Sequence, residues 1–90
     1  MRELLVDTRR QTGEDGRTVD CRYYILVGEM AMSGGMSCES YGVKVVGADG
    51  EEASVPNLTV SAGRIDQLME LLVRNGVTPV TLRDVVEDWL

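Results

Sequence analysis

The chain has 90 residues, 43% apolar and 27% charged, with no histidine and a net charge of −6. This length and balance predict one folded domain, residues 1–90, with an aliphatic core because phenylalanine is absent. The acidic charge opposes binding to nucleic acids and anionic membranes, and no apolar run approaches the ~20 residues that cross a bilayer. Two cysteines without zinc spacing, and no signal-peptide pattern, indicate a reduced, cytoplasmic protein.

Four segments in the first two thirds of the chain have the alternation of β-strands. The first is Arg2–Arg9, and the second, which alternates most regularly, is Thr18–Val27. The third is Tyr41–Val46. The fourth is Ala53–Val60, where Pro56 confines the strand to a sheet edge because proline cannot donate a ladder hydrogen bond.

Glycine-rich connections separate the expected strands. Residues 11–16 and 48–51 each contain an Asp-Gly pair, which favours a tight hairpin turn. Residues 29–40 lack periodicity and contain Ser33-Gly34-Gly35, which predicts a loop or a long irregular hairpin connection. Because short connections favour antiparallel pairing of sequential strands, residues 1–60 predict a four-stranded meander.

The remainder of the chain, residues 61–90, predicts a helical hairpin. Ser61–Asn75 and Thr81–Leu90 carry apolar residues at helical spacing. The side chains expected to anchor the two helices in the core are Ile65, Leu68, Leu82 and Trp89. The second helix is short and its acidic end opposes the helix dipole, so packing must hold it and Trp89 should be largely buried. The fold class is therefore α+β, an antiparallel sheet with both helices packed on one face.

No residue pattern predicts catalysis. The absence of histidine removes the commonest general base and metal ligand, together with every Ser-His or Cys-His arrangement. Asp84 and Asp88 share one helix face, which is typical of a solvent-exposed surface. This acidic face also argues against the second helix as a DNA-recognition helix. The sequence therefore predicts a protein that is not an enzyme and has no catalytic residue, resident metal or cofactor.

Residues 30–38 concentrate three of the five methionines beside a cysteine: Met30, Met32, Met36 and Cys38. Thioether and thiolate groups are the ligands that copper(I) prefers, although this spacing is not diagnostic of a metal site. Methionine also serves as adaptable packing or as a contact surface for a partner. Both interpretations stay open for this segment, whereas Cys21 is expected to be buried as a small hydrophobic residue.

Three further apolar residues fall outside the sheet face and the helix stripe that are expected to form the core: Tyr24, Leu26 and Leu71. An uncovered apolar patch of this kind often marks association. We therefore expect a non-catalytic interaction module that binds a protein partner, or a second copy of itself as a homodimer, through these residues and the methionine segment. The alternative is a binder of a small ligand or a soft metal at residues 30–38.

Three stretches carry a resemblance to a known family: Tyr41–Val45, Leu58–Ser61 and Val77–Asp88. They resemble a family of small, single-domain, Clostridia-type (Firmicutes) proteins of unknown function, chiefly over residues 41–90. The resemblance implies a bacterial, cytosolic protein without an assigned activity, and it transfers no functional residue to this chain.

Overall fold

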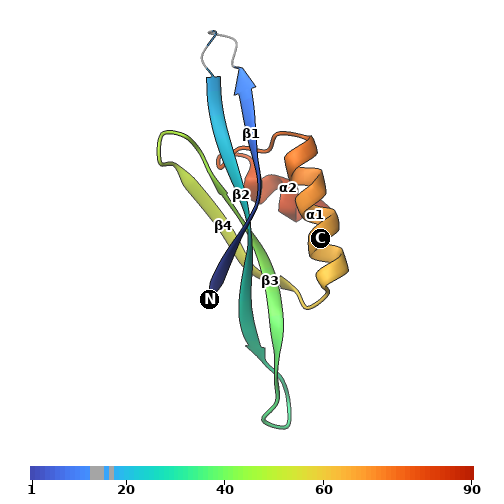
Figure 1. The fold of residues 1–90 in the computed structure, drawn as a ribbon. Coiled ribbons are helices and arrows are strands. Elements are labelled where there is room, and N and C mark those ends of the chain that lie inside the picture. The colour runs from blue at the N-terminus through green and yellow to red at the C-terminus, as the bar shows by residue number, and fades with distance from the viewer. Residues whose placement is uncertain (13–15, 17) are drawn as a thin grey trace.

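Residues 1–12, 16 and 18–90 are described by the computed structural model, in which four antiparallel strands precede two helices (Figure 1). The elements are β1 (Arg2–Thr12), β2 (Thr18–Ala31), β3 (Ser37–Val46), β4 (Glu52–Thr59), α1 (Ala62–Arg74) and α2 (Leu82–Trp89). The strands lie in the order β1-β2-β3-β4, which confirms the predicted meander and the α+β class. Residues 13–15 of the first predicted turn lie outside the described residues. In the second turn, Gly50 has a φ of 86°, the left-handed conformation for which glycine is suited.

Both helices pack on the same face of the sheet (Figure 1). Alternate residues of β2 and β3 point into this layer because successive strand side chains face opposite sides. The buried core consists of Cys21, Tyr23, Val43, Val45, Ile65, Leu68, Met69, Leu72, Val77, Leu82 and Val86. Three predicted anchors, Ile65, Leu68 and Leu82, are at most 1% exposed and lie in this core. The burial predicted for Cys21 is confirmed as well.

Trp89 is partly buried and packs against the core, which agrees with the burial predicted for it, although its ring is not fully enclosed. The core contacts of α2 come from its first two turns, where Leu82 and Val86 are 0% and 2% exposed. Trp89 lies in the last turn and packs at the margin of the core. The guanidinium carbon of Arg64 lies 4.5 Å from its ring centroid, a cation–π distance. The indole is therefore covered by a surface arginine and by peripheral core.

The first helix is capped at both ends, whereas the start of α2 has no side-chain cap. The Ser61 side chain caps α1 by accepting a hydrogen bond from the Arg64 backbone N–H at 3.2 Å. After α1, the Val77 N–H donates to the Leu72 carbonyl at 3.0 Å, which closes the helix end. The spacing of Thr81 resembles a capping box, but its side chain makes no cap hydrogen bond and instead bonds back to Thr78.

The segment 29–40 is a hairpin, as one of the two predicted alternatives had it, but its strands are regular and longer than expected. β2 continues to Ala31 and β3 begins at Ser37, with Met30 paired to Cys38. The Met32 N–H donates to the Met36 carbonyl at 2.7 Å and closes the turn. Apolar periodicity is missing here because the hairpin projects past β1 and β4, whose last partners on it are Val27 and Tyr41. No layer covers this end of the sheet in Figure 1.

A wide bulge in β4 shapes the opposite edge of the sheet. Tyr41 pairs with Thr59 and Val43 with Val55, so three residues of β4, 56–58, lie opposite Gly42 alone. Asn57 within the bulge has a φ of 56°. The backbone of the bulge comes so close to Gly42 that a Cβ there would lie 2.3 Å from the Val55 carbonyl oxygen. Gly42 is therefore required for this close approach.

Tyr23 joins the sheet to the segment between the helices. Its side chain is 0% exposed, and its hydroxyl donates to the Val77 carbonyl at 2.9 Å. Burial disfavours the phenolate and raises the pKa of Tyr23 to about 12, above the ordinary value of 10.0. The protonated hydroxyl is thus the form that the fold requires.

We expect the free energy of unfolding to fall as the pH rises from about 10 towards 12, since the folded pKa of Tyr23 lies above the unfolded one. This contribution is complete below pH 10.0 and is lost as the pH rises, by roughly 2–3 kcal/mol. Tyr23→Phe should cost about 1–2 kcal/mol at neutral pH, because the Val77 carbonyl loses its donor, and should flatten the alkaline decrease. Urea unfolding of both proteins across this pH range checks the prediction. Parallel alkaline slopes for the two proteins would contradict it.

Candidate functional site

The outer edge of β1 is the longest unpaired strand edge in the part of the chain that the structure describes. β1 has 11 residues and pairs only with β2. Its side chains Leu4, Leu5 and Val6 are 48%, 58% and 46% exposed. β4, the other edge, has 8 residues and carries Pro56 and the wide bulge, which are features that block strand addition. β1 therefore offers a pairing edge that β4 does not.

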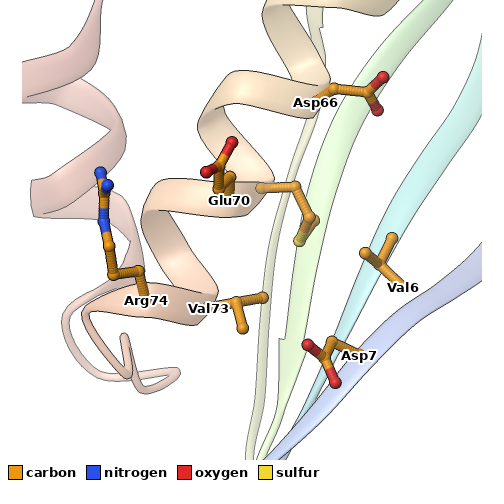
Figure 2. A pocket seen from close by; sticks show the side chains of 7 residues that line it. Val6, Asp7, Asp66, Glu70, Val73 and Arg74 are labelled. Atoms are coloured by element: carbon orange, nitrogen blue, oxygen red, sulfur yellow. The ribbon is translucent and has the colours of Figure 1, made fainter.

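A groove of about 430 Å³ runs between β1 and α1, on the helix-covered face (Figure 2). It is lined by Val6, Asp7, Asp66, Met69, Glu70, Val73 and Arg74. Met69 is 1% exposed and forms part of an apolar floor with Val6 and Val73. Asp66 and Glu70 lie one helical turn apart on α1, and Asp7 faces them from β1, so carboxylates rim the apolar floor (Figure 2).

A single-residue bulge places Val6 at this groove. β1 pairs in one register up to Leu5 and in another from Asp7, which leaves Val6 as the extra residue. Such a bulge locally re-aims side chains. The exposed run Leu4-Leu5-Val6 therefore presents apolar groups along the edge and towards α1, although the strand itself alternates.

The two arginines near the groove do not neutralise its rim. One guanidinium nitrogen of Arg9, Nη1, donates to the carbonyls of Val73 and Arg74 at 2.5 and 2.6 Å, at the C-terminus of α1. A cation is favourable at this end of a helix, and the contact fixes β1 against α1. The Arg74 side chain points away from β1 (Figure 2). The groove thus combines an apolar floor with a negative rim.

Within residues 1–12, 16 and 18–90, no three His, Cys, Asp or Glu side chains lie close enough together to hold a metal ion. The side chains of Asp66 and Glu70, which form the rim on α1, are exposed to solvent. An apolar floor beside an unpaired strand edge is suited to an extended polypeptide, whose backbone bonds to the edge and whose side chains enter the groove.

The predicted partner surface does not form one patch. Leu26 is 4% exposed, so it cannot serve as a contact residue and that prediction is wrong. Tyr24 is partly buried on the sheet face away from the helices. Leu71 lies in the helix layer, in a shallow hollow with Val85 and Trp89.

The sheet face that carries Leu26 is crossed by ion pairs and by the β4 bulge. Leu26 pairs with Gly42, and the backbone of the bulge occupies the space that a side chain at Gly42 would take. Lys44 Nζ lies 2.8 Å from Glu3 Oε1 and 3.6 Å from Glu52 Oε2, so it links β1, β3 and β4 across β2. The hydrogen bond to Glu3 is the main cause that raises the pKa of Lys44. Cross-strand contacts therefore cover a face that the sequence predicts to be open.

The methionine segment lies at the far end of the β2–β3 hairpin, away from the groove. Met30, Met32 and Met36 are 38%, 54% and 71% exposed, and Cys38 is partly exposed. The sequence pattern singles out these residues, for packing or for contact with a partner or metal, but it does not predict the groove. The signals that could have found the groove are the apolar run in residues 4–6 and the i, i+4 pair of acids at 66 and 70, which leave one helix face acidic.

Comparison with known proteins extends the resemblance seen in the sequence. No helix among the described residues is both long and apolar enough to cross a membrane. No curated protein and no solved structure matches the chain. A family model covers residues 2–90, nearly the whole chain rather than its C-terminal half, and the chain thus belongs to a family of unknown function, DUF6514.

Proposed function

We propose that this protein is a non-catalytic interaction module that binds an extended, basic segment of a partner protein along the outer edge of β1. The observation that carries the proposal is the juxtaposition of the unpaired β1 edge with the acid-rimmed groove to α1. An added strand satisfies backbone N–H and C=O groups that otherwise bond only to water, and this gives affinity with little side-chain requirement.

The groove supplies selectivity to this mode of binding. Alternate side chains of an added strand face the same side, so every second residue of the partner would lie over the groove. Apolar side chains suit the floor formed by Val6, Met69 and Val73, while lysine or arginine suits the rim. A segment that alternates small apolar and basic residues fits both requirements.

Charge also favours a partner over a second copy of this chain. Each chain carries a net charge of −6, so two copies repel one another. Edge-to-edge pairing of two β1 strands with the helix layers on the same side would bring like-charged α1 rims towards each other. The carboxylates of Asp66 and Glu70 from both copies would then repel one another, which disfavours self-association through this edge.

The test uses a capped nine-residue peptide in which lysine alternates with valine, and a control peptide in which glutamate replaces lysine. We expect the basic peptide to bind with micromolar affinity in fluorescence anisotropy, and the acidic peptide not to bind. The double variant Asp66→Lys/Glu70→Lys should weaken binding about thirtyfold, because two rim attractions of roughly 0.5 kcal/mol each become repulsions of similar size, a change of about 2 kcal/mol. Salt at about 0.5 M should weaken wild-type binding as well, since it shortens the Debye length to below ~5 Å.

The matched control is Glu51→Lys/Glu87→Lys, which changes the net charge by the same amount on exposed sites away from the groove. This variant should bind nearly as the wild type does. Equal weakening by both double variants would show that only net charge matters, and would contradict the groove. Equal affinity for the basic and acidic peptides would contradict charge selection, and no binding of either would contradict the proposal.

A further inference from the structure

We propose that the β2–β3 hairpin carries a copper(I) site formed by the sulfur atoms of Met30, Met32, Met36 and Cys38. This site is separate from the groove between β1 and α1 and is independent of the function proposed above. Its basis is the cross-strand register, which the sequence alone leaves undetermined. The register places all four sulfur-bearing side chains on one face of the hairpin.

Two consecutive cross-strand pairs supply the four groups. Met30 lies directly opposite Cys38 in the β2–β3 ladder. Met32 lies opposite Met36, to which it is joined by the backbone hydrogen bond of 2.7 Å. Residues 30 and 32, like 36 and 38, are two apart, so their side chains point to the same side of the hairpin. Directly opposite Cβ atoms lie about 4.5–5.5 Å apart, within the reach of flexible methionine side chains.

The hairpin is both rigid enough to hold these groups and open enough to admit an ion. Its strands pair continuously up to Ala31 and Ser37, and the turn glycines Gly34 and Gly35 have φ of 84° and 77°. The three methionines are 38–71% exposed, although large apolar side chains in a small protein are usually withdrawn from water. None of the four belongs to the hydrophobic core. Packing of the fold therefore does not explain their position.

The donor set selects the ion. Thioether and thiolate ligands are soft and favour copper(I), whereas zinc takes thiolate, imidazole or carboxylate. The neighbouring residues Glu29 and Glu39 lie opposite each other in the β2–β3 ladder, with their side chains on the other face of the hairpin. Their carboxylates therefore do not contribute oxygen ligands. On binding, the Cys38 thiol would release its proton to water, and the thiolate would balance the single positive charge of the ion. No change of oxidation state is involved.

The test is an anaerobic titration of the reduced, full-length protein with copper(I) in competition with a chromophoric copper(I) chelator. We expect one ion per chain. Cys38→Ser and Met30→Leu should each lower the affinity at least about tenfold. Cys21→Ala, which removes the buried thiol that lies outside this end of the hairpin, should leave the affinity unchanged. When copper(I) is added, the methyl NMR signals of Met30, Met32 and Met36 should shift together, while the signal of Met69 should not.

Three results would overturn the proposal. The first is the absence of competition with the chelator. The second is unchanged affinity in the triple variant Met30→Leu/Met32→Leu/Met36→Leu, which would assign the binding to Cys38 alone. The third is a shift of the Met69 signal as large as those of the hairpin methionines. Circular dichroism of each variant verifies that the fold is retained, so that loss of binding reports on the ligands.

Discussion

Gly42→Ala should destabilise the protein by about 3 kcal/mol, a large part of the roughly 5–13 kcal/mol expected for a domain of this size. The added Cβ would lie 2.3 Å from the Val55 carbonyl oxygen and 2.6 Å from the Pro56 Cα. Both obstacles are backbone atoms, so no side-chain rotation relieves the contact. Either the β4 bulge or the β3–β4 pairing has to move. Urea unfolding followed by circular dichroism measures the loss.

The matched control is Gly63→Ala, in the first turn of α1. The nearest atom to a Cβ there is the Ser61 Oγ at 3.9 Å, an ordinary van der Waals contact. Alanine is the better helix former, so this variant should be unchanged or more stable by up to about 1 kcal/mol. The same glycine-to-alanine change should thus lower the free energy of unfolding at Gly42 but not at Gly63. A loss of less than about 1 kcal/mol at Gly42 would contradict the close approach of the β4 bulge.

Leu82→Ala should cost about 3 kcal/mol and release α2 before the remainder of the fold. Leu82 is 0% exposed and is the first residue of α2. This helix has 8 residues, too few to persist alone, and no basic residue in its last turn offsets its acidic C-terminal end. Packing through Leu82 and Val86 is therefore its main support.

The fluorescence of Trp89 reports the release of α2. In the wild type the indole packs at the core margin beside Arg64, so its emission lies between those of buried and free indole. In Leu82→Ala the emission should move towards that of indole in water at denaturant concentrations where the sheet persists. Val80→Ala is the control, because Val80 is 73% exposed and its truncation should change stability by less than about 0.5 kcal/mol. Coincident loss of Trp89 and sheet signals in Leu82→Ala would contradict separate release.

The sequence was sufficient to predict the elements that bury apolar residues at a regular period. The 3.6-residue spacing of Ile65, Leu68 and Leu72 and the alternation around Tyr23 place these side chains in the core where they were expected. The spacing of apolar residues specifies which side chains share one face of a helix or strand, and this is nearly sufficient to predict which of them form the core. Both the meander and the helix layer follow from it.

Features that depend on register and on bulges could not be predicted in this way. The burial of Leu26 arises from pairing with Gly42 and from the ion pair between Glu3 and Lys44, which are far apart in the sequence. The groove arises because Val6 is an extra residue in β1. A single-residue change of register moves every side chain to the other face, and composition does not encode it.

Amide hydrogen exchange along β1, with and without the basic peptide, tests the central claim most directly. About half of the β1 amides point away from β2, because antiparallel pairing uses alternate residues. In the free protein these amides should exchange rapidly, and the peptide should protect them while leaving β4 unchanged. Absence of new protection in β1 would contradict strand addition at this edge. Protection in the free protein that rises with its concentration would contradict it as well, because a second copy would then occupy β1.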